Sequence, residues 1–262
     1  MKIKHIFLFF LLALIGACSD NSKKDYDLII RNGLIYDGSG NAPISSDIAI
    51  NGSFIALIGD LSNSTAEKEI NAEGMAVAPG FINVLSWATQ PLIIDGRAMS
   101  DIKQGVTLEI MGEGRSMGPL NESMKIREKN RQSNIKYDIE WTTLGEYLDF
   151  IVKQGVSVNV ASYVGATTIR VHELGYEDRA PTSDELERMK QLVRNAMREG
   201  ALGVGSSLIY TPANFAETDE LIALVSAAAE YNGRYISHLR SEANKLEEAV
   251  LELIKISSIT GA

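Results

Sequence analysis

The sequence predicts an α/β protein in which parallel strands alternate with helices, preceded by a small module of short antiparallel strands. Two Asn-Gly pairs, Asn32-Gly33 and Asn51-Gly52, each separate short apolar runs, and this pattern is typical of hairpins. From Ala76 onward, apolar runs of strand length alternate with amphipathic helical segments. Such alternation indicates parallel strands joined by right-handed crossovers.

The composition of the chain argues against some classes of function. The chain has 262 residues, 25 Lys and Arg against 34 Asp and Glu, and a formal net charge of −9. A nucleic-acid partner is therefore not expected, because phosphate binding needs a basic face. Three histidines and one cysteine leave few side chains for a metal site.

The first residues have the pattern of a bacterial lipoprotein signal. An unbroken apolar run over 6–15 follows two lysines, and it is too short to span a bilayer as a mature helix. The next residues, ending in Ala17-Cys18, resemble a lipobox, in which the cysteine is acylated. We expect a signal peptide over 1–17, a tether over 18–26, and a location in the cell envelope with a lipid anchor on Cys18. An ordinary cleaved signal with an incidental cysteine is the alternative.

The module over 27–75 is expected to contain at least four strands. Asp27–Arg31 and Leu34–Tyr36 flank the first Asn-Gly pair, and Asp47–Ile50 and Phe54–Ile58 flank the second. Each pair of runs predicts one hairpin.

Five strands and four well-marked helices are expected after this module. The strands are predicted over 76–84, 106–111, 156–164, 201–208 and 234–237, and the helices over 143–154, 182–199, 218–231 and 243–258. Thr182 and Glu185 have the spacing of a capping box. Five strands are compatible with a doubly wound sheet, whereas a closed (β/α)₈ barrel needs eight.

Eight segments carry a resemblance to a known family. They are Asp27–Gly38, Ile55–Gly59, Ala76–Ile82, Gln104–Thr107, Asp178–Thr182, Ala196–Gly203, Leu208–Tyr210 and Ser237–Glu242. In this order they resemble the metal-dependent amidohydrolase superfamily, and most closely its N-acyl-D-amino-acid deacylase (D-aminoacylase) branch. The resemblance implies a (β/α)₈ TIM-type barrel, of which 76–262 would supply about five strands, and a small β-sandwich, of which 27–75 would be the first part. It also implies hydrolysis of an N-acyl amide by a metal-activated water.

The same resemblance implies metal ligands at the ends of strands. The family's first strand ends in Asp-x-His-x-His, whereas this chain has Asn83-Val-Leu-Ser-Trp87, so Leu85 and Trp87 replace both histidines. Glu113 occupies the position of a second-strand ligand, and His238 that of a fifth-strand ligand. One zinc ion held by these two residues is therefore implied. A surface-loop glutamate and a hydrogen-bonded histidine at a strand end are the alternatives.

Other positions complete this expected site. Leu85, Trp87, Tyr210 and Arg240 are expected to line the substrate pocket, although Tyr210 also suits a core or rim position and Arg240 a structural one. His172 is expected in a solvated loop. The family's remaining metal histidine and its general acid–base aspartate would lie beyond Ala262, so the chain is expected to be a truncated form, inactive alone.

Three functional hypotheses follow from these observations. The first is a lipid-anchored, zinc-dependent hydrolase of a small N-acyl amino acid. The second is a non-catalytic surface lipoprotein that binds acylated amino acids or peptides through an apolar pocket at Leu85 and Trp87. The third is a complete doubly wound binding domain, which has no glycine-rich phosphate or dinucleotide loop to support it.

Overall fold

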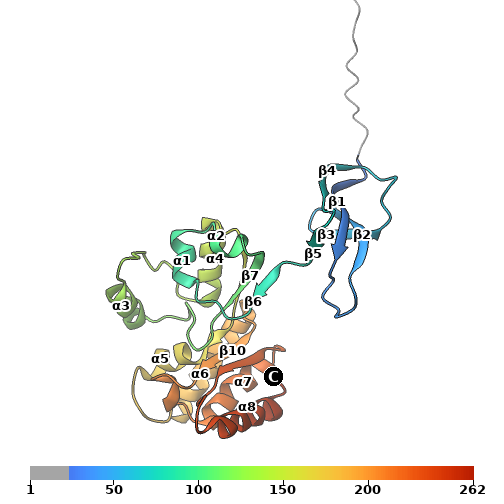
Figure 1. Cartoon of the computed structure of the whole chain (residues 1–262). Coiled ribbons are helices and arrows are strands. Elements are labelled where there is room, and N and C mark those ends of the chain that lie inside the picture. The colour runs from blue at the N-terminus through green and yellow to red at the C-terminus, as the bar shows by residue number, and fades with distance from the viewer. Residues whose placement is uncertain (1–23) are drawn as a thin grey trace, which may run out of the picture. The chain divides into compact units, whose positions relative to one another are not determined.

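The computed structural model describes residues 24–262, so the predicted signal peptide and the lipid site at Cys18 lie outside the described residues. The chain divides into two compact units between Pro79 and Gly80. Both units are shown in Figure 1. None of the helices formed by the described residues has both the length and the apolar character required to cross a bilayer.

The first unit is one β-sheet. Its strands are β1 (Tyr26–Ile35), β2 (Ile44–Asn51), β3 (Phe54–Gly59), β4 (Ala66–Asn71) and β5 (Ala76–Val77). They are ordered β3-β2-β1-β4, and β5 pairs with the far end of β1. The β1–β2 and β2–β3 pairs are antiparallel, while β4 and β5 run parallel to β1. A small core of Ile29, Ala49 and Leu61 holds the unit together.

One of the two predicted hairpins is wrong. Asn51-Gly52 does connect β2 to β3, but Asn32-Gly33 lies within the continuous strand β1 as a bulge opposite β2. Asn32 has a positive φ of 59° and its amide donates to Asp47 Oδ1 at 2.8 Å. A Cβ on Gly33 would lie 2.6 Å from the Val77 side chain. An Asn-Gly pair suits both a tight hairpin turn and a bulge in which one residue has a positive φ. Pairing of β1 with β2 and β5 selects the bulge.

The second unit contains six short strands in two parallel sheets. The strands are β6 (Phe81–Asn83), β7 (Val106–Met111), β8 (Asn159–Ser162), β9 (Val164–Gly165), β10 (Gly203–Ser207) and β11 (Arg234–His238). The sheets are ordered β6-β7-β8 and β9-β10-β11. Only Tyr163 separates β8 from β9, so the two form one segment that pairs with β7 on one side and β10 on the other. The strands therefore follow one another in chain order, as expected for the first five strands of a (β/α)₈ barrel.

The run over 76–84 does not form the single strand that the sequence predicts. Ala76–Val77 pairs with β1 in the first unit, whereas Phe81–Asn83 pairs with β7 in the second. Pro79 lies between them and has no amide hydrogen to continue a strand ladder.

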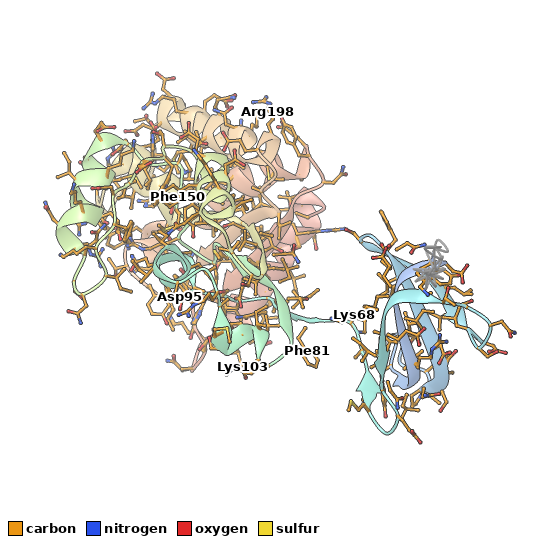
Figure 2. All side chains as sticks on the ribbon, turned by 90° about the horizontal axis from the view of Figure 1, so that it is seen from above. Lys68, Phe81, Asp95, Lys103, Phe150 and Arg198 are labelled. Atoms are coloured by element: carbon orange, nitrogen blue, oxygen red, sulfur yellow. The ribbon has the colours of Figure 1, made fainter. Side chains whose placement is uncertain are left out.

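Helices connect the parallel strands. They are α1 (Thr89–Ile94), α2 (Met99–Ile102), α3 (Glu122–Arg131), α4 (Leu144–Gln154), α5 (Ala166–Leu174), α6 (Ser183–Arg198), α7 (Thr218–Ala229) and α8 (Leu246–Thr260), with a 3₁₀ turn η1 (Ala213–Phe215) before α7. The Thr182–Glu185 capping box is present at the start of α6. Trp141, which is 1% exposed, anchors the core, and its ring centroid lies 5.0 Å from that of Phe150. Phe150 is labelled among the side chains of this unit in Figure 2.

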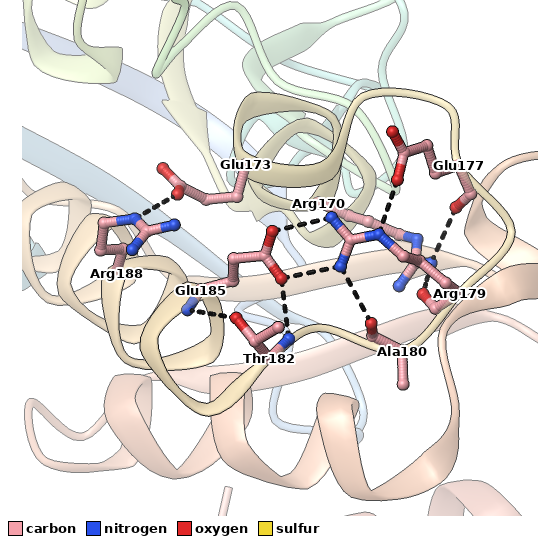
Figure 3. Close-up of polar contacts among 8 residues, drawn as sticks. All are labelled: Arg170, Glu173, Glu177, Arg179, Ala180, Thr182, Glu185 and Arg188. Atoms are coloured by element: carbon pink, nitrogen blue, oxygen red, sulfur yellow. Dashed lines mark hydrogen bonds and ion pairs between the residues drawn. The ribbon is translucent and has the colours of Figure 1, made fainter.

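An arginine network holds the loop between α5 and α6. Arg179 contacts Glu177 and forms two hydrogen bonds of 2.7 Å with Glu185, which also accepts from the Thr182 amide (Figure 3). Arg170, 1% exposed, donates from α5 to the backbone carbonyls of residues 177 and 179. The segment Asp178–Thr182, which carries part of the family resemblance, therefore has a structural role.

Candidate metal centre and adjoining cavity

A tight glycine turn places Glu113 at the end of β7. Gly112 and Gly114 have φ values of 97° and 72°, which favour glycine. A Cβ on Gly112 would lie 2.0 Å from the Tyr163 carbonyl oxygen, and one on Gly114 would lie 1.7 Å from Ser207 Oγ. The turn is thus pressed between the ends of β8 and β10, and it directs the Glu113 side chain across the strand ends.

This turn brings Glu113 close to His238, the last residue of β11. Glu113 Oε2 lies 3.8 Å from His238 Nδ1, with side-chain exposures of 11% and 23%. β11 is held in place by pairing with β10, in which Ser207 lies opposite His238. Burial raises the pKa of Glu113, and the neighbouring His238 opposes that rise only in part. Two residues 125 positions apart in sequence therefore meet at the strand ends.

Two further side chains surround His238. Its Nε2 lies 3.2 Å from Glu242 Oε1, and the Tyr210 ring lies 5.1 Å from the imidazole between centroids. Tyr210 itself is 58% exposed. The structure thus brings Glu113, His238 and Tyr210 together.

The donor types of this pair suit zinc. Carboxylate oxygen and imidazole nitrogen are both zinc ligands, and two such atoms on one tetrahedral ion lie roughly 3.4 Å apart. The observed 3.8 Å is close to that separation. No group of three His, Cys, Asp or Glu side chains among residues 24–262 is arranged to hold a metal ion. The Glu113–His238 pair therefore stays a predicted ligand set.

The end of β6 carries no metal ligand. Leu85 and Trp87 are 45% and 57% exposed. The Asn83 amide instead donates to Glu109 Oε2 at 3.0 Å. Glu109 is buried in β7, and burial, with a smaller contribution from the charge of Asp101, raises the pKa of its carboxyl group. Glu109 was not predicted as a site residue, although a glutamate within an apolar strand is itself a signal.

Arg240 is committed to structural contacts. Its guanidinium group forms two hydrogen bonds of 2.9 Å with Glu252 and donates to the carbonyls of Asn214 and Ala216. It therefore ties the segment after β11 to α8 and to the turn before α7.

The expectation for His172 was wrong. His172 lies in helix α5, half-buried, with Nδ1 3.0 Å from Glu173 Oε1. The sequence around it lacks a helical apolar stripe because nearly the whole first turn of α5 is buried, so periodicity gave no signal.

A cavity of about 610 Å³ opens beside the candidate metal centre. Trp87, Gly112, Arg115 and Thr167 line it from the strand ends, and α3 contributes further residues. Leu85, Glu113, His238 and Tyr210 are not among its lining residues. Of the predicted pocket residues, the structure places only Trp87 in this cavity. Helix α3 was missed because it is polar and contains no buried residue.

Comparison with known proteins agrees with this architecture. The chain is 30% identical over 242 residues to a D-aminoacylase of Alcaligenes xylosoxydans xylosoxydans, covering 91% of this chain and 49% of that protein. An N-acyl-D-aspartate deacylase of the same organism is 30% identical over 246 residues, covering 90% and 48%. The chain is a homologue of the D-aminoacylase-type amidohydrolases.

The chain also has the fold of these amidohydrolases. A crystal structure of N-acyl-D-glutamate deacylase from Bordetella bronchiseptica, complexed with zinc and a phosphonate inhibitor, superposes with a TM-score of 0.81 at 28% identity. The match covers 92% of this chain and 50% of that one. No protein-family model matches the chain. The expected amidohydrolase fold is confirmed, and this chain spans about half the length of the relatives that it matches.

Proposed function

We propose that this chain is the N-terminal part of a zinc-dependent hydrolase that cleaves the amide bond of an N-acyl amino acid. The observation that carries the proposal is the meeting of Glu113 and His238 at the ends of β7 and β11, on the side of the barrel where ligands and substrates bind. D-Aminoacylase and N-acyl-D-aspartate deacylase are the relatives matched over this region.

Glu113 and His238 would hold one zinc ion. When bound, the ion would polarise the amide carbonyl and lower the pKa of a water molecule. The ring of Tyr210 packs at 5.1 Å beside His238 and restricts the orientation of the imidazole. Exposed Leu85 and Trp87 would contact the apolar acyl chain in place of the missing histidine pair. The general acid–base aspartate would lie in the part of the relatives' length that this chain does not span.

Zinc-dependent turnover is the decisive test of this activity. The full-length protein, with about one equivalent of Zn²⁺ added, is expected to release free amino acid from N-acetyl-D-amino acids, and Glu113→Gln is expected to lower the rate at least about 100-fold. The Glu140→Gln variant, at an exposed position, serves as the matched control. Binding of the N-acyl amino acid without any turnover would reject the enzyme and support the non-catalytic binding protein.

We further propose that the protein is located in the bacterial cell envelope and is held there by acyl chains on Cys18. The apolar run over 6–15 and the Ala17-Cys18 junction support this. A Cys18→Ser variant is expected to leave the membrane fraction or to keep its signal peptide uncleaved, since acylated Cys18 is the predicted anchor. Unchanged membrane association and processing in that variant would reject the anchor.

A further inference from the structure

The cavity beside the candidate metal centre is rimmed by three arginines. Arg115 follows the glycine turn, and Arg127 and Arg131 extend from α3. A second hollow of about 940 Å³ shares the same three arginines. This concentration of positive charge stands out in a chain with a net charge of −9.

These arginines differ from others in the same unit. Arg97, Arg179 and Arg194 each have a carboxylate partner at 2.6–3.0 Å. Within residues 24–262, no ion pair joins a carboxylate to Arg115, Arg127 or Arg131. Their guanidinium groups are therefore available to an anionic ligand, and a planar guanidinium binds carboxylate in a two-pronged geometry.

The cavity also contains a buried polar atom without a partner. Thr167, 4% exposed, lines the cavity, and its Oγ1 makes no hydrogen bond in the described structure. Burying a hydroxyl group without a hydrogen-bond partner costs free energy. A ligand that supplies this partner would therefore bind more tightly. The one carboxylate in the cavity wall, Glu128, already accepts hydrogen bonds from Gln90 and Tyr137.

The side chain of Arg127 is held in a defined position. Its guanidinium carbon lies 4.0 Å from the centre of the Tyr176 ring, a cation–π arrangement that restricts the side chain while leaving its edge open. Tyr176 itself precedes the loop that Arg170 and Arg179 fix (Figure 3). The cationic rim is thus supported by the fold around it.

We infer that this cavity binds the side-chain carboxylate of an acidic N-acyl amino acid. The inference rests on the proposed function and deepens it by naming the substrate class. Gly112 lines the cavity and is followed directly by Glu113, so a ligand in the cavity would lie next to the candidate metal centre. A substrate with a neutral side chain has only its α-carboxylate to pair with the three arginines. An acidic substrate carries two carboxylates and therefore matches the charge of the rim better.

Calorimetric titration of the full chain, with a chelator present to remove zinc, tests this assignment. N-Acetyl-D-glutamate is expected to bind at least about tenfold more tightly than N-acetyl-D-glutamine, because the pair differs by one carboxylate and a charge-assisted hydrogen bond contributes at least that factor. Arg127→Met should remove most of this difference in affinity between the two ligands. Arg127→Lys should retain part of it. Arg97→Met, at an exposed arginine outside the cavity, is the matched control.

Several results would overturn the inference. They are equal affinity for the two ligands, an equal loss in Arg97→Met, or inorganic phosphate binding as tightly as N-acetyl-D-glutamate, which would indicate a general anion site. Because the titration needs neither zinc nor turnover, its outcome is separate from that of the hydrolysis assay. An enzyme that hydrolyses only neutral N-acyl amino acids would keep the proposed function and reject this substrate class.

Discussion

Replacing His238 by alanine is expected to lower the affinity of the protein for zinc at least about tenfold. Loss of a residue that only orients a metal ligand typically costs 10–100-fold in affinity, and His238 is proposed as a direct ligand. Its imidazole lies 3.8 Å from the Glu113 carboxylate, so the variant would leave a half-buried carboxylate without its nitrogen partner. Competition with a zinc-binding dye measures the change in affinity.

His172 provides the matched control for this experiment. It lies in α5, paired with Glu173, and is not part of the candidate centre. His172→Ala should therefore leave zinc affinity unchanged. Zinc binding that survives His238→Ala, or that falls equally in both variants, would show that the Glu113–His238 pair does not hold the ion.

Replacing Arg170 by methionine is expected to lower the free energy of unfolding by about 3–5 kcal/mol. The Arg170 and Glu220 side chains are 1% and 4% exposed and form an ion pair between α5 and α7. Removal of the arginine alone would leave the Glu220 charge buried and unpaired. It would also remove the donors that hold the backbone carbonyls of residues 177 and 179. Chemical denaturation measures the loss.

A double variant separates the buried charge from general disruption. Arg170→Met combined with Glu220→Leu removes both charges, so it should recover much of the lost stability, as apolar replacement of buried ion pairs often does. Arg188→Met breaks an ion pair of an arginine side chain that is 56% exposed and should cost no more than about 1 kcal/mol. A double variant no more stable than Arg170→Met would contradict this explanation.

Residue patterns alone predicted the two members of the candidate metal centre but not their geometry. Glu113 and His238 could be singled out because each directly follows or ends an apolar strand and matches a ligand position of the amidohydrolases. The short distance between their side chains could not be predicted from such patterns. It depends on Gly112 and Gly114, whose positive φ values allow the turn to pack against Tyr163 and Ser207.

The cavity beside the candidate metal centre could not be predicted from the sequence, for a different reason. Its rim is formed by a helix, α3, that buries none of its residues, so no apolar periodicity marks it. The Thr167 hydroxyl gains its significance only from the surrounding packing, which leaves it 4% exposed and without a partner.

By itself, the sequence determined the alternation of strands and helices, the hairpin at Asn51-Gly52, the cap of α6, and the replacement of the histidine pair by Leu85 and Trp87. These features are local, because each depends on residues that are neighbours in the chain. The tertiary structure decided that Asn32-Gly33 is a bulge, that His172 lies in a helix, and that Glu113 meets His238. Each of these depends on contacts between distant segments, and such contacts exist only after the strands have paired and the helices have packed.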